Sequence, residues 1–353
     1  MIRAKPAVEA LDPYRAPLEG RRSKLRLDFN ENTLGPSPRV LQAISKLGTT
    51  DIAAYPEYAG LAAAYAGELG LTAAQVAAFN GVDAAIRAVF DAFGDAGATF
   101  LTTMPTFGYY RPCADLQGMC THAIPYGEGL AFPSEAFASA LAGTPRLAFI
   151  CNPNNPTGTL IPAGELLSLA RRAPETLVVV DELYADYTGV SVLPEALALS
   201  NVVVLRSLSK SYGLAGLRIG FAVAPPELLD RLTRVVGPYD INSVAVAAAR
   251  EALADRDYRD KYVQEVAAAK AWTVKALRER GQRVHADGGN YVLVWPDRPL
   301  SWVVARLAEH GVLVRSMEGK PLIGDSFRLT IGTCEQMAEF LTRFDSAIAE
   351  PPS

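Results

Sequence analysis

The chain has 353 residues, of which 50% are hydrophobic and 20% are charged, and its formal net charge is −4 at pH 7. A chain of this length and composition predicts one large domain with a smaller one, or two domains of similar size, and excludes wholesale disorder. The small net charge gives no support for a nucleic-acid-binding or acidic-membrane-binding surface.

The four cysteines show no CxxC spacing, and the three histidines are isolated from one another. These spacings indicate reduced thiols in a cytoplasmic protein and argue against a metal held by protein ligands. The first residues contain prolines and interspersed charges but no apolar segment of the signal-peptide kind. No apolar run approaches the roughly 20 residues that span a bilayer, so we expect a soluble, cytoplasmic protein.

In chain order, the first informative stretch is "FNGVDAAIRAVFDAFG", residues 79–94. It reads as the end of a strand, a glycine turn and the start of a helix. The backbone N–H groups of Val82, Asp83 and Ala84 would face an anion at the N-terminus of that helix.

Four short apolar runs follow, at residues 146–150, 176–181, 201–207 and 219–224. Continuous apolar runs of this length are typical of strands that are covered on both faces of a sheet. The stretch "PAGELLSLARRAP" between the first two runs has helical spacing. This succession predicts an α/β domain with a mostly parallel sheet.

Polar residues follow three of these strands at the point where each ends. "NPNNPTG" follows the first, Asp181 and Tyr184 follow the second, and Ser209 and Lys210 follow the third. In open α/β sheets, ligands bind outside the carboxyl ends of the strands. The alternatives at this stage are that the first stretch is a plain loop and that Asp181 caps a helix.

The character of these residues suggests a cofactor. A buried carboxylate needs a cation or a hydrogen-bond donor, and Ser207, Ser209 and Arg218 offer hydroxyls and a planar charged group to a phosphate. Together with Lys210, these groups describe a site for pyridoxal 5′-phosphate. The lysine would form the Schiff base, and Asp181 would keep the pyridine nitrogen protonated.

Beyond Asn242 the pattern changes to two helices, at residues 243–254 and 256–281, with Gly281 as the residue that ends the second. Strands are expected in "NYVLVW", "GVLVRS" and "SFRLTIG", with helices near residues 302–309 and 335–349. This part predicts a smaller α+β domain joined through the long helix.

Eight motifs together resemble the histidinol-phosphate aminotransferase family of fold-type I pyridoxal-phosphate enzymes. In chain order they are "LDFNENTLGPSP", "YPEYAG", "PTFGYY", "NPNNPTG", "DELYADY", "SLSKSYGLAGLRIGF", "PYDIN" and "FRLTIGT". The resemblance implies a three-layer α/β/α large domain with a mostly parallel sheet and a smaller α+β C-terminal domain. It implies an N-terminal arm of residues 1–29 packing with the small domain, a large domain of residues 30–245 and a small domain of residues 246–353.

The same resemblance implies roles for the cofactor residues. Lys210 would be the Schiff-base lysine and Asp181 the partner of the pyridine nitrogen, while Asn155 and Tyr184 would hold the phenolic oxygen of the ring. Tyr110 would stack on the pyridine face, and an ordinary core residue is the alternative. Matches to the phosphate ligands are Ser207, Ser209, Arg218 and the backbone at Val82 and Asp83. Tyr55 would reach the phosphate from the neighbouring subunit, which implies a homodimer.

For the substrate, Arg328 matches the arginine that binds the α-carboxylate of an amino acid, and Arg315 matches the position associated with the phosphate of histidinol phosphate. A solvent-facing Arg328 is the alternative. Asn30, Tyr14 and Tyr239 match residues around the substrate. The implied function is transamination between histidinol phosphate and 2-oxoglutarate in histidine biosynthesis.

Three other functions remain open at this stage. An aromatic-amino-acid aminotransferase would share every cofactor residue. A lyase of the threonine-phosphate decarboxylase kind would use the same lysine, and a pyridoxal-phosphate-binding regulatory domain would need no catalysis.

Overall fold

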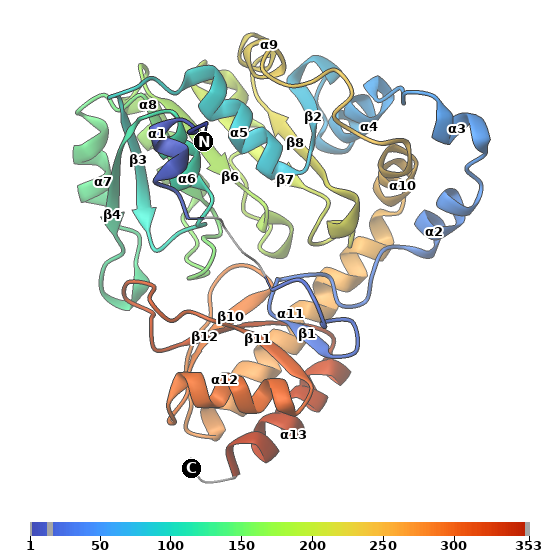
Figure 1. Cartoon of the computed structure of the whole chain (residues 1–353), viewed down its shortest axis with the longest axis vertical. Helices are drawn as coiled ribbons and strands as arrows, with labels where there is room; N and C mark the ends of the chain where they lie inside the picture. The colour runs from blue at the N-terminus through green and yellow to red at the C-terminus, as the bar shows by residue number, and fades with distance from the viewer. Residues whose placement is uncertain (1, 13–16, 350–353) are drawn as a thin grey trace.

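A seven-stranded sheet dominates the computed structural model, which describes residues 2–12 and 17–349. Its strand order is β2-β8-β7-β6-β5-β3-β4, and all neighbours are parallel except β8, which runs antiparallel to β2 and β7 (Figure 1). The strands are β2 Val76–Asn80, β3 Thr99–Met104, β4 Cys120–Pro125, β5 Leu147–Cys151, β6 Leu177–Asp181, β7 Val202–Ser207 and β8 Ile219–Val223. This mixed, mostly parallel sheet confirms the predicted fold class.

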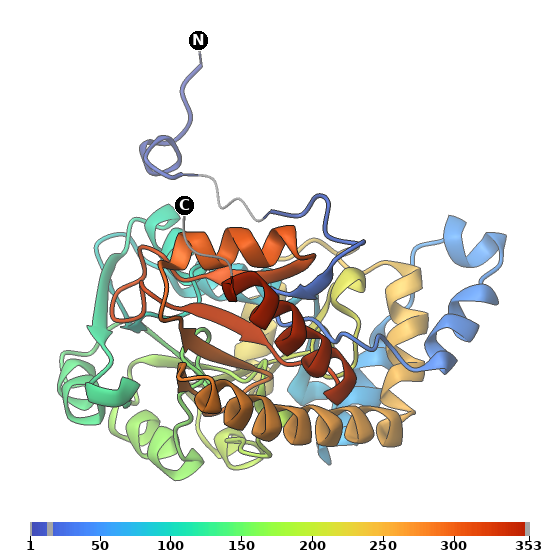
Figure 2. The ribbon, with the colours of Figure 1, turned by 90° about the horizontal axis from the view of Figure 1, so that it is seen from below.

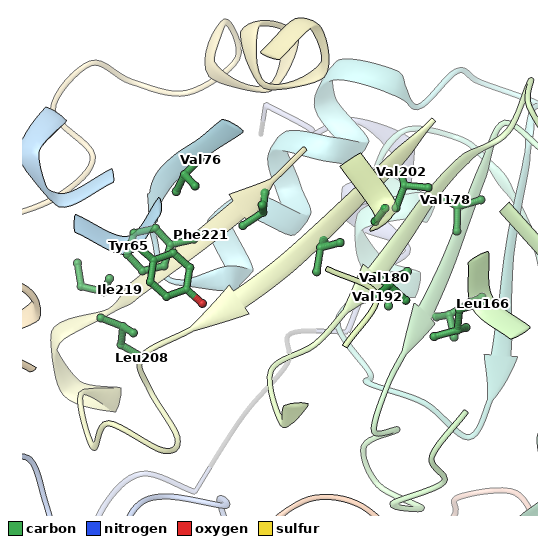
Figure 3. Close-up of a cluster of buried hydrophobic side chains, with 14 of the residues drawn as sticks. Tyr65, Val76, Leu166, Val178, Val180, Val192, Val202, Leu208, Ile219 and Phe221 are labelled. Atoms are coloured by element: carbon green, nitrogen blue, oxygen red, sulfur yellow. The ribbon is translucent and has the colours of Figure 1, made fainter. Parts of the chain in front are cut away.

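The central strands are buried on both faces, as their continuous apolar runs predicted. In β6, Val178 and Val180 point into one hydrophobic cluster, and Val179 points into the cluster on the opposite face. Figure 3 shows the first cluster, where Val178 and Val180 lie near Leu166 of the flanking helix. Every position of such a strand is apolar because helices cover both faces of the sheet.

Helices form the two outer layers of the large sheet. Residues of α2 Pro38–Ser45, α4 Ala59–Leu69, α7 Ser134–Leu141, α8 Ala163–Arg172 and α10 Ser243–Leu253 join the first cluster. Residues of α5 Val82–Phe93, α6 Tyr110–Leu116 and α9 Pro226–Thr233 join the second. The short helices α1 Pro6–Glu9 and α3 Thr49–Ala53 add no residue to either cluster.

A five-stranded sheet with the order β1-β11-β12-β10-β9 forms the smaller part of the molecule (Figure 2). Its strands are β1 Leu25–Leu27, β9 Arg283–His285, β10 Tyr291–Trp295, β11 Val312–Ser316 and β12 Phe327–Thr330. The helices α11 Arg256–Glu279, α12 Leu300–Glu309 and α13 Cys334–Ala349 pack against it in a third apolar cluster. Strand β1 pairs in parallel with β11, so the N-terminal segment completes this sheet.

Helix α11 leads from the large part to the small one, and the turn after it contains Gly281 with φ 75°. Glycine adopts this left-handed conformation without a steric penalty, as predicted. The predicted domain boundary between residues 245 and 246 falls inside α10, whose Ala245, Ala248 and Ala249 lie in the large-sheet core. A division after α10 fits this packing better. Within the described residues, no helix combines the length and apolar character that crossing a membrane requires.

Candidate active site

A cavity of about 310 Å³ lies at the carboxyl ends of β5, β6 and β7 and reaches the small sheet. It brings together polar side chains that lie far apart in the sequence. The predicted site residues that line it are Val82, Asp83, Asn155, Asp181, Tyr184, Ser207, Ser209, Lys210, Arg218, Arg315 and Arg328.

Lys210 is the lysine of this cavity that was predicted to form the Schiff base. Its Nζ donates a hydrogen bond to the backbone oxygen of Phe29 at 2.9 Å and lies 6.0 Å from the ring centre of Tyr184. Burial, together with the nearby guanidinium of Arg328, lowers the pKa of the Lys210 amine to about 8. A lysine of this kind releases its proton near neutral pH and can act as a nucleophile or a base.

Asp181 ends β6 and is only 1% exposed. Its Oδ2 accepts a hydrogen bond from the Tyr110 hydroxyl at 2.6 Å, and its Oδ1 accepts one from the Leu183 backbone N–H at 3.2 Å. Burial raises the pKa of the Asp181 carboxyl to about 6, and these two donors act against that rise. The carboxylate is therefore held charged at neutral pH in an apolar surrounding.

Two further polar side chains at the cavity are fixed by partners from the small sheet and the N-terminal segment. The Tyr184 hydroxyl accepts a hydrogen bond from Asn30 Nδ2 at 3.0 Å. The side chain of Asn155 accepts one from Arg328, whose other terminal nitrogen donates to the Asp28 carbonyl at 2.8 Å. These contacts fix the orientation of the Tyr184 and Asn155 side chains at the cavity.

A second group of donors gathers where α5 begins. Ser207 ends β7 and Ser209 lies on the loop after it. Arg218 forms an ion pair with Asp83 at 2.8 Å. The first N–H groups of a helix have no partner within the helix, so those of Val82 and Asp83 are free to face an anion. Hydroxyls, a guanidinium and helix N–H groups are the donors that a phosphate needs.

Glycine keeps this anion cradle open. A Cβ built on Gly81 would lie 2.5 Å from Arg218 Nη2, and a Cβ built on Gly220 would lie 2.5 Å from the Val82 nitrogen. Any larger residue at these two positions would displace the donors.

Residues 22–344 match the family model described as aminotransferase class I and II. The chain belongs to this family. Among curated relatives, histidinol-phosphate aminotransferase 2 of Methylococcus capsulatus is 34% identical over 98% of each chain. The histidinol-phosphate aminotransferase of Symbiobacterium thermophilum is also 34% identical, and the match covers 99% of this chain and 100% of that one.

A solved structure gives the same result. The histidinol-phosphate aminotransferase from Sinorhizobium meliloti, in complex with pyridoxal 5′-phosphate, superposes with a TM-score of 0.91 at 25% identity. The match covers 99% of this chain and 98% of that one. The protein is thus an aminotransferase whose architecture is that of the fold-type I enzymes.

Four predicted site residues of this aminotransferase lie outside the cavity, and two of them are buried behind it. Tyr110 is fully buried with its hydroxyl on Asp181, so its predicted stacking position is wrong: the ring that lines the cavity from the same motif is Phe107. Asn30 is also fully buried, because its side chain bonds to Tyr184 and Thr330. Its predicted direct contact with substrate is therefore not what the structure shows.

The other two, Tyr55 and Tyr239, are exposed. Their rings stack on each other with centroids 3.9 Å apart and line no part of the cavity of their own chain. Because Tyr239 lines no part of the cavity of its own chain, its place around the substrate stays a prediction. The predicted Tyr14 lies outside the described residues.

Sequence reasoning missed several cavity residues. Those that it did not name are Leu18, Phe29, Thr106, Phe107, Gly108, Cys151, Pro156, Leu183, Met317 and Lys320. Most lie next to a motif that it did name: Phe107 is in "PTFGYY", and Leu183 follows Asp181 by two positions. Leu18 and Lys320 lie in segments with no motif, so no local signal distinguishes them.

Proposed function

We propose that this aminotransferase uses pyridoxal 5′-phosphate to transfer an amino group from histidinol phosphate to 2-oxoglutarate. The donor set supports the cofactor, because one cavity holds a lysine of lowered pKa, a buried carboxylate and a phosphate cradle. The bound cofactor supplies a protonated pyridine ring that withdraws electrons from the substrate Cα.

In this proposal each residue named at the cavity has a defined task. Lys210 would hold the cofactor through its carbonyl and would move the proton at the substrate Cα, a task that suits an amine with a pKa of about 8. Asp181 keeps the ring nitrogen protonated, and Asn155 and Tyr184 hold the phenolic oxygen. Phe107, which lines the cavity, would take the stacking role that the sequence suggested for Tyr110.

The phosphate cradle anchors the cofactor. Ser207, Ser209 and Arg218 donate from side chains, and Val82 and Asp83 donate from the backbone. Because this anchor and Asp181 lie at different strand ends, they would hold a bound cofactor at two points and so orient it.

One observation carries the choice of substrate: Arg315 and Arg328 lie at paired positions of neighbouring strands, and both line the cavity. A single arginine suffices for an amino acid whose side chain is aromatic. The second guanidinium matches a donor that brings a phosphate, in which three oxygens accept charge-assisted hydrogen bonds.

We further propose that the enzyme is a cytoplasmic homodimer in which Tyr55 reaches the phosphate of the partner's cofactor. The free state of Cys113, Cys120, Cys151 and Cys334 supports a reducing compartment. The 72% exposure of Tyr55, which lines no part of its own cavity, supports a role across an interface.

A panel of amino donors with 2-oxoglutarate tests this proposal. Histidinol phosphate should give the highest kcat/KM, with phenylalanine and tyrosine well below it. A strong preference for phenylalanine would instead make the protein an aromatic-amino-acid aminotransferase. Release of CO₂ from a phosphoamino acid, without amino transfer, would make it a lyase.

A further inference from the structure

We infer that Tyr110 is a positioning residue that holds the Asp181 carboxylate charged and aimed at the cavity. This inference rests on the proposed function, because the task of Asp181 is to face a protonated ring nitrogen. In this role Tyr110 acts through its hydroxyl, whereas stacking on the cofactor would need only its ring.

The contact itself is short and buried. Tyr110 begins α6 and is 0% exposed, and its hydroxyl donates to Oδ2 of Asp181 at 2.6 Å. Hydrogen bonds to an ionised acceptor are shorter and about twice as strong as neutral ones. Because Leu183 N–H bonds the other oxygen, each carboxylate oxygen has one protein donor and keeps a lone pair for the cavity.

The ring of Tyr110 cannot swing away from this contact. It packs edge-to-face against Phe107 with centroids 5.5 Å apart and lies 5.0 Å from the Phe149 ring. Phe107 in turn lines the cavity. One buried tyrosine thus supports both the carboxylate and the aromatic wall, so its substitution must separate the two effects.

The electrostatics of the surroundings explain why a donor is needed. Burial, Asp83 of α5 and Glu182 just after β6 all raise the pKa of Asp181, whereas Tyr110 and Leu183 N–H lower it. Cys151, the neighbour of Asp181 on β5, is buried as a neutral thiol because its own pKa is raised. The cations Lys210 and Arg218 line the same cavity. Without the Tyr110 hydroxyl, the carboxyl would bind a proton more tightly and lose charge near neutral pH.

Tyr110→Phe tests the inference, because it removes the hydroxyl and keeps the ring against Phe107. Tyr126→Phe is the matched control, since Tyr126 is also buried and its hydroxyl bonds to Thr103 rather than to Asp181. Equilibrium binding of pyridoxal 5′-phosphate is measured with cofactor-depleted full-length protein by its visible absorbance. We expect roughly tenfold weaker binding for Tyr110→Phe, the cost of a hydrogen bond to a charged group, and less than twofold for Tyr126→Phe.

A double-mutant cycle makes the readout specific. Asp181→Asn alone should weaken cofactor binding, and adding Tyr110→Phe to it should change the affinity by less than twofold. In protein labelled with ¹³C at aspartate carboxyls, the signal lost in Asp181→Asn should titrate at higher pH in Tyr110→Phe. Multiplicative losses in the double variant, or an unchanged carboxyl titration, would overturn the inference.

The two levels of proposal fail in different ways. If the wild-type protein binds no pyridoxal 5′-phosphate, the proposed function falls. If the wild type binds it and Tyr110→Phe behaves like Tyr126→Phe, only the role of Tyr110 falls.

Discussion

Arg315 of β11 and Arg328 of β12 are register partners on antiparallel strands, and both line the cavity that contains Lys210. Side chains directly opposite each other on such strands lie on the same face of the sheet. Two like charges placed directly opposite each other are destabilising. An anion between or beside them removes this repulsion, so the pair is suited to a doubly charged ligand.

The first prediction concerns the contribution of Arg315 to the recognition of the substrate phosphate. Arg315→Ala should lower kcat/KM for histidinol phosphate by about 100-fold, the loss of a charge-assisted contact. It should change kcat/KM for phenylalanine by much less, because phenylalanine brings no phosphate. Steady-state kinetics with both donors and saturating 2-oxoglutarate measure the two ratios.

Arg283→Ala is the control for this experiment. Arg283 belongs to the same sheet but stacks over Trp295 at 4.2 Å and does not line the cavity. It should leave both ratios near the wild-type values. An equal loss for the two donors in Arg315→Ala would show that this arginine does not read the phosphate.

The second prediction follows from the pKa of Lys210. Because the folded-state pKa of Lys210, about 8, lies below the ordinary lysine pKa of 10.5, the folded protein carries a penalty for the buried charge below pH 8. That penalty fades as the pH rises from 8 to 10.5. Cofactor-free Lys210→Met should therefore be more stable than the cofactor-free wild type at pH 7, on the order of 1 kcal/mol after solvent screening.

Thermal unfolding of both proteins at pH 7 and pH 10 measures this difference. The gain in Tm should shrink at the higher pH. A gain that is the same at both values would mean that the lysine titrates normally, and the same variant should lack transaminase activity at every pH.

The third prediction concerns the glycine beside the phosphate cradle. In Gly220→Ala the new Cβ would meet the Val82 nitrogen at 2.5 Å, so the first turn of α5 must move. We expect cofactor binding to weaken by roughly tenfold or more, because the N–H groups at the start of α5 would no longer point at the phosphate.

Gly164→Ala is the matched change for that variant. Gly164 lies in α8, and a Cβ there would meet open space. It should leave cofactor affinity unchanged and stabilise the protein by about 0.4–1 kcal/mol, as alanine does in helices. Cofactor titration and thermal unfolding of the two variants measure these effects. Normal cofactor affinity in Gly220→Ala would contradict the proposal that the start of α5 binds the phosphate.

The fourth prediction tests the proposed contribution of Tyr55 across a subunit interface. Tyr55→Phe should weaken cofactor binding, whereas Tyr58→Phe should not, because the Tyr58 hydroxyl donates to Pro238 O of its own chain at 2.7 Å. Mixed dimers of Tyr55→Phe and Lys210→Ala chains then contain one site with both groups intact. At limiting cofactor, mixing should restore activity above that of either parent.

Mixing without recovery, in samples that mass spectrometry shows to contain the mixed dimer, would place Tyr55 in the site of its own chain or outside any site. A monomer in light scattering would remove the interface altogether.

The cavity residues at strand ends could be predicted from the sequence because a buried strand ends where its continuous apolar run gives way to polar residues. Asp181 and Ser207 each close a continuous apolar run, and in a parallel sheet such ends meet at one edge. The pattern of apolar and polar residues is local, so it survives without knowledge of the rest of the chain.

The choice among neighbouring aromatic residues could not be predicted in this way. "PTFGYY" offers three rings within four positions, and only the start of α6 at Tyr110 turns that ring inward and leaves Phe107 at the cavity. Asn30 shows the same limit, since its left-handed backbone, φ 54°, and its bonds to Tyr184 and Thr330 arise from contacts with distant segments.

By itself, the sequence determined the order of the elements, the layered α/β architecture and the strand ends that carry Lys210, Asp181 and Ser207. These follow from hydrophobic periodicity, which acts over a few residues. Tertiary structure alone decided that Tyr110 holds Asp181 and that Arg315 and Arg328 are register partners on neighbouring strands. Both relationships depend on the direction of side chains from separate elements, and only the packing of those elements and the register of β11 against β12 set that direction.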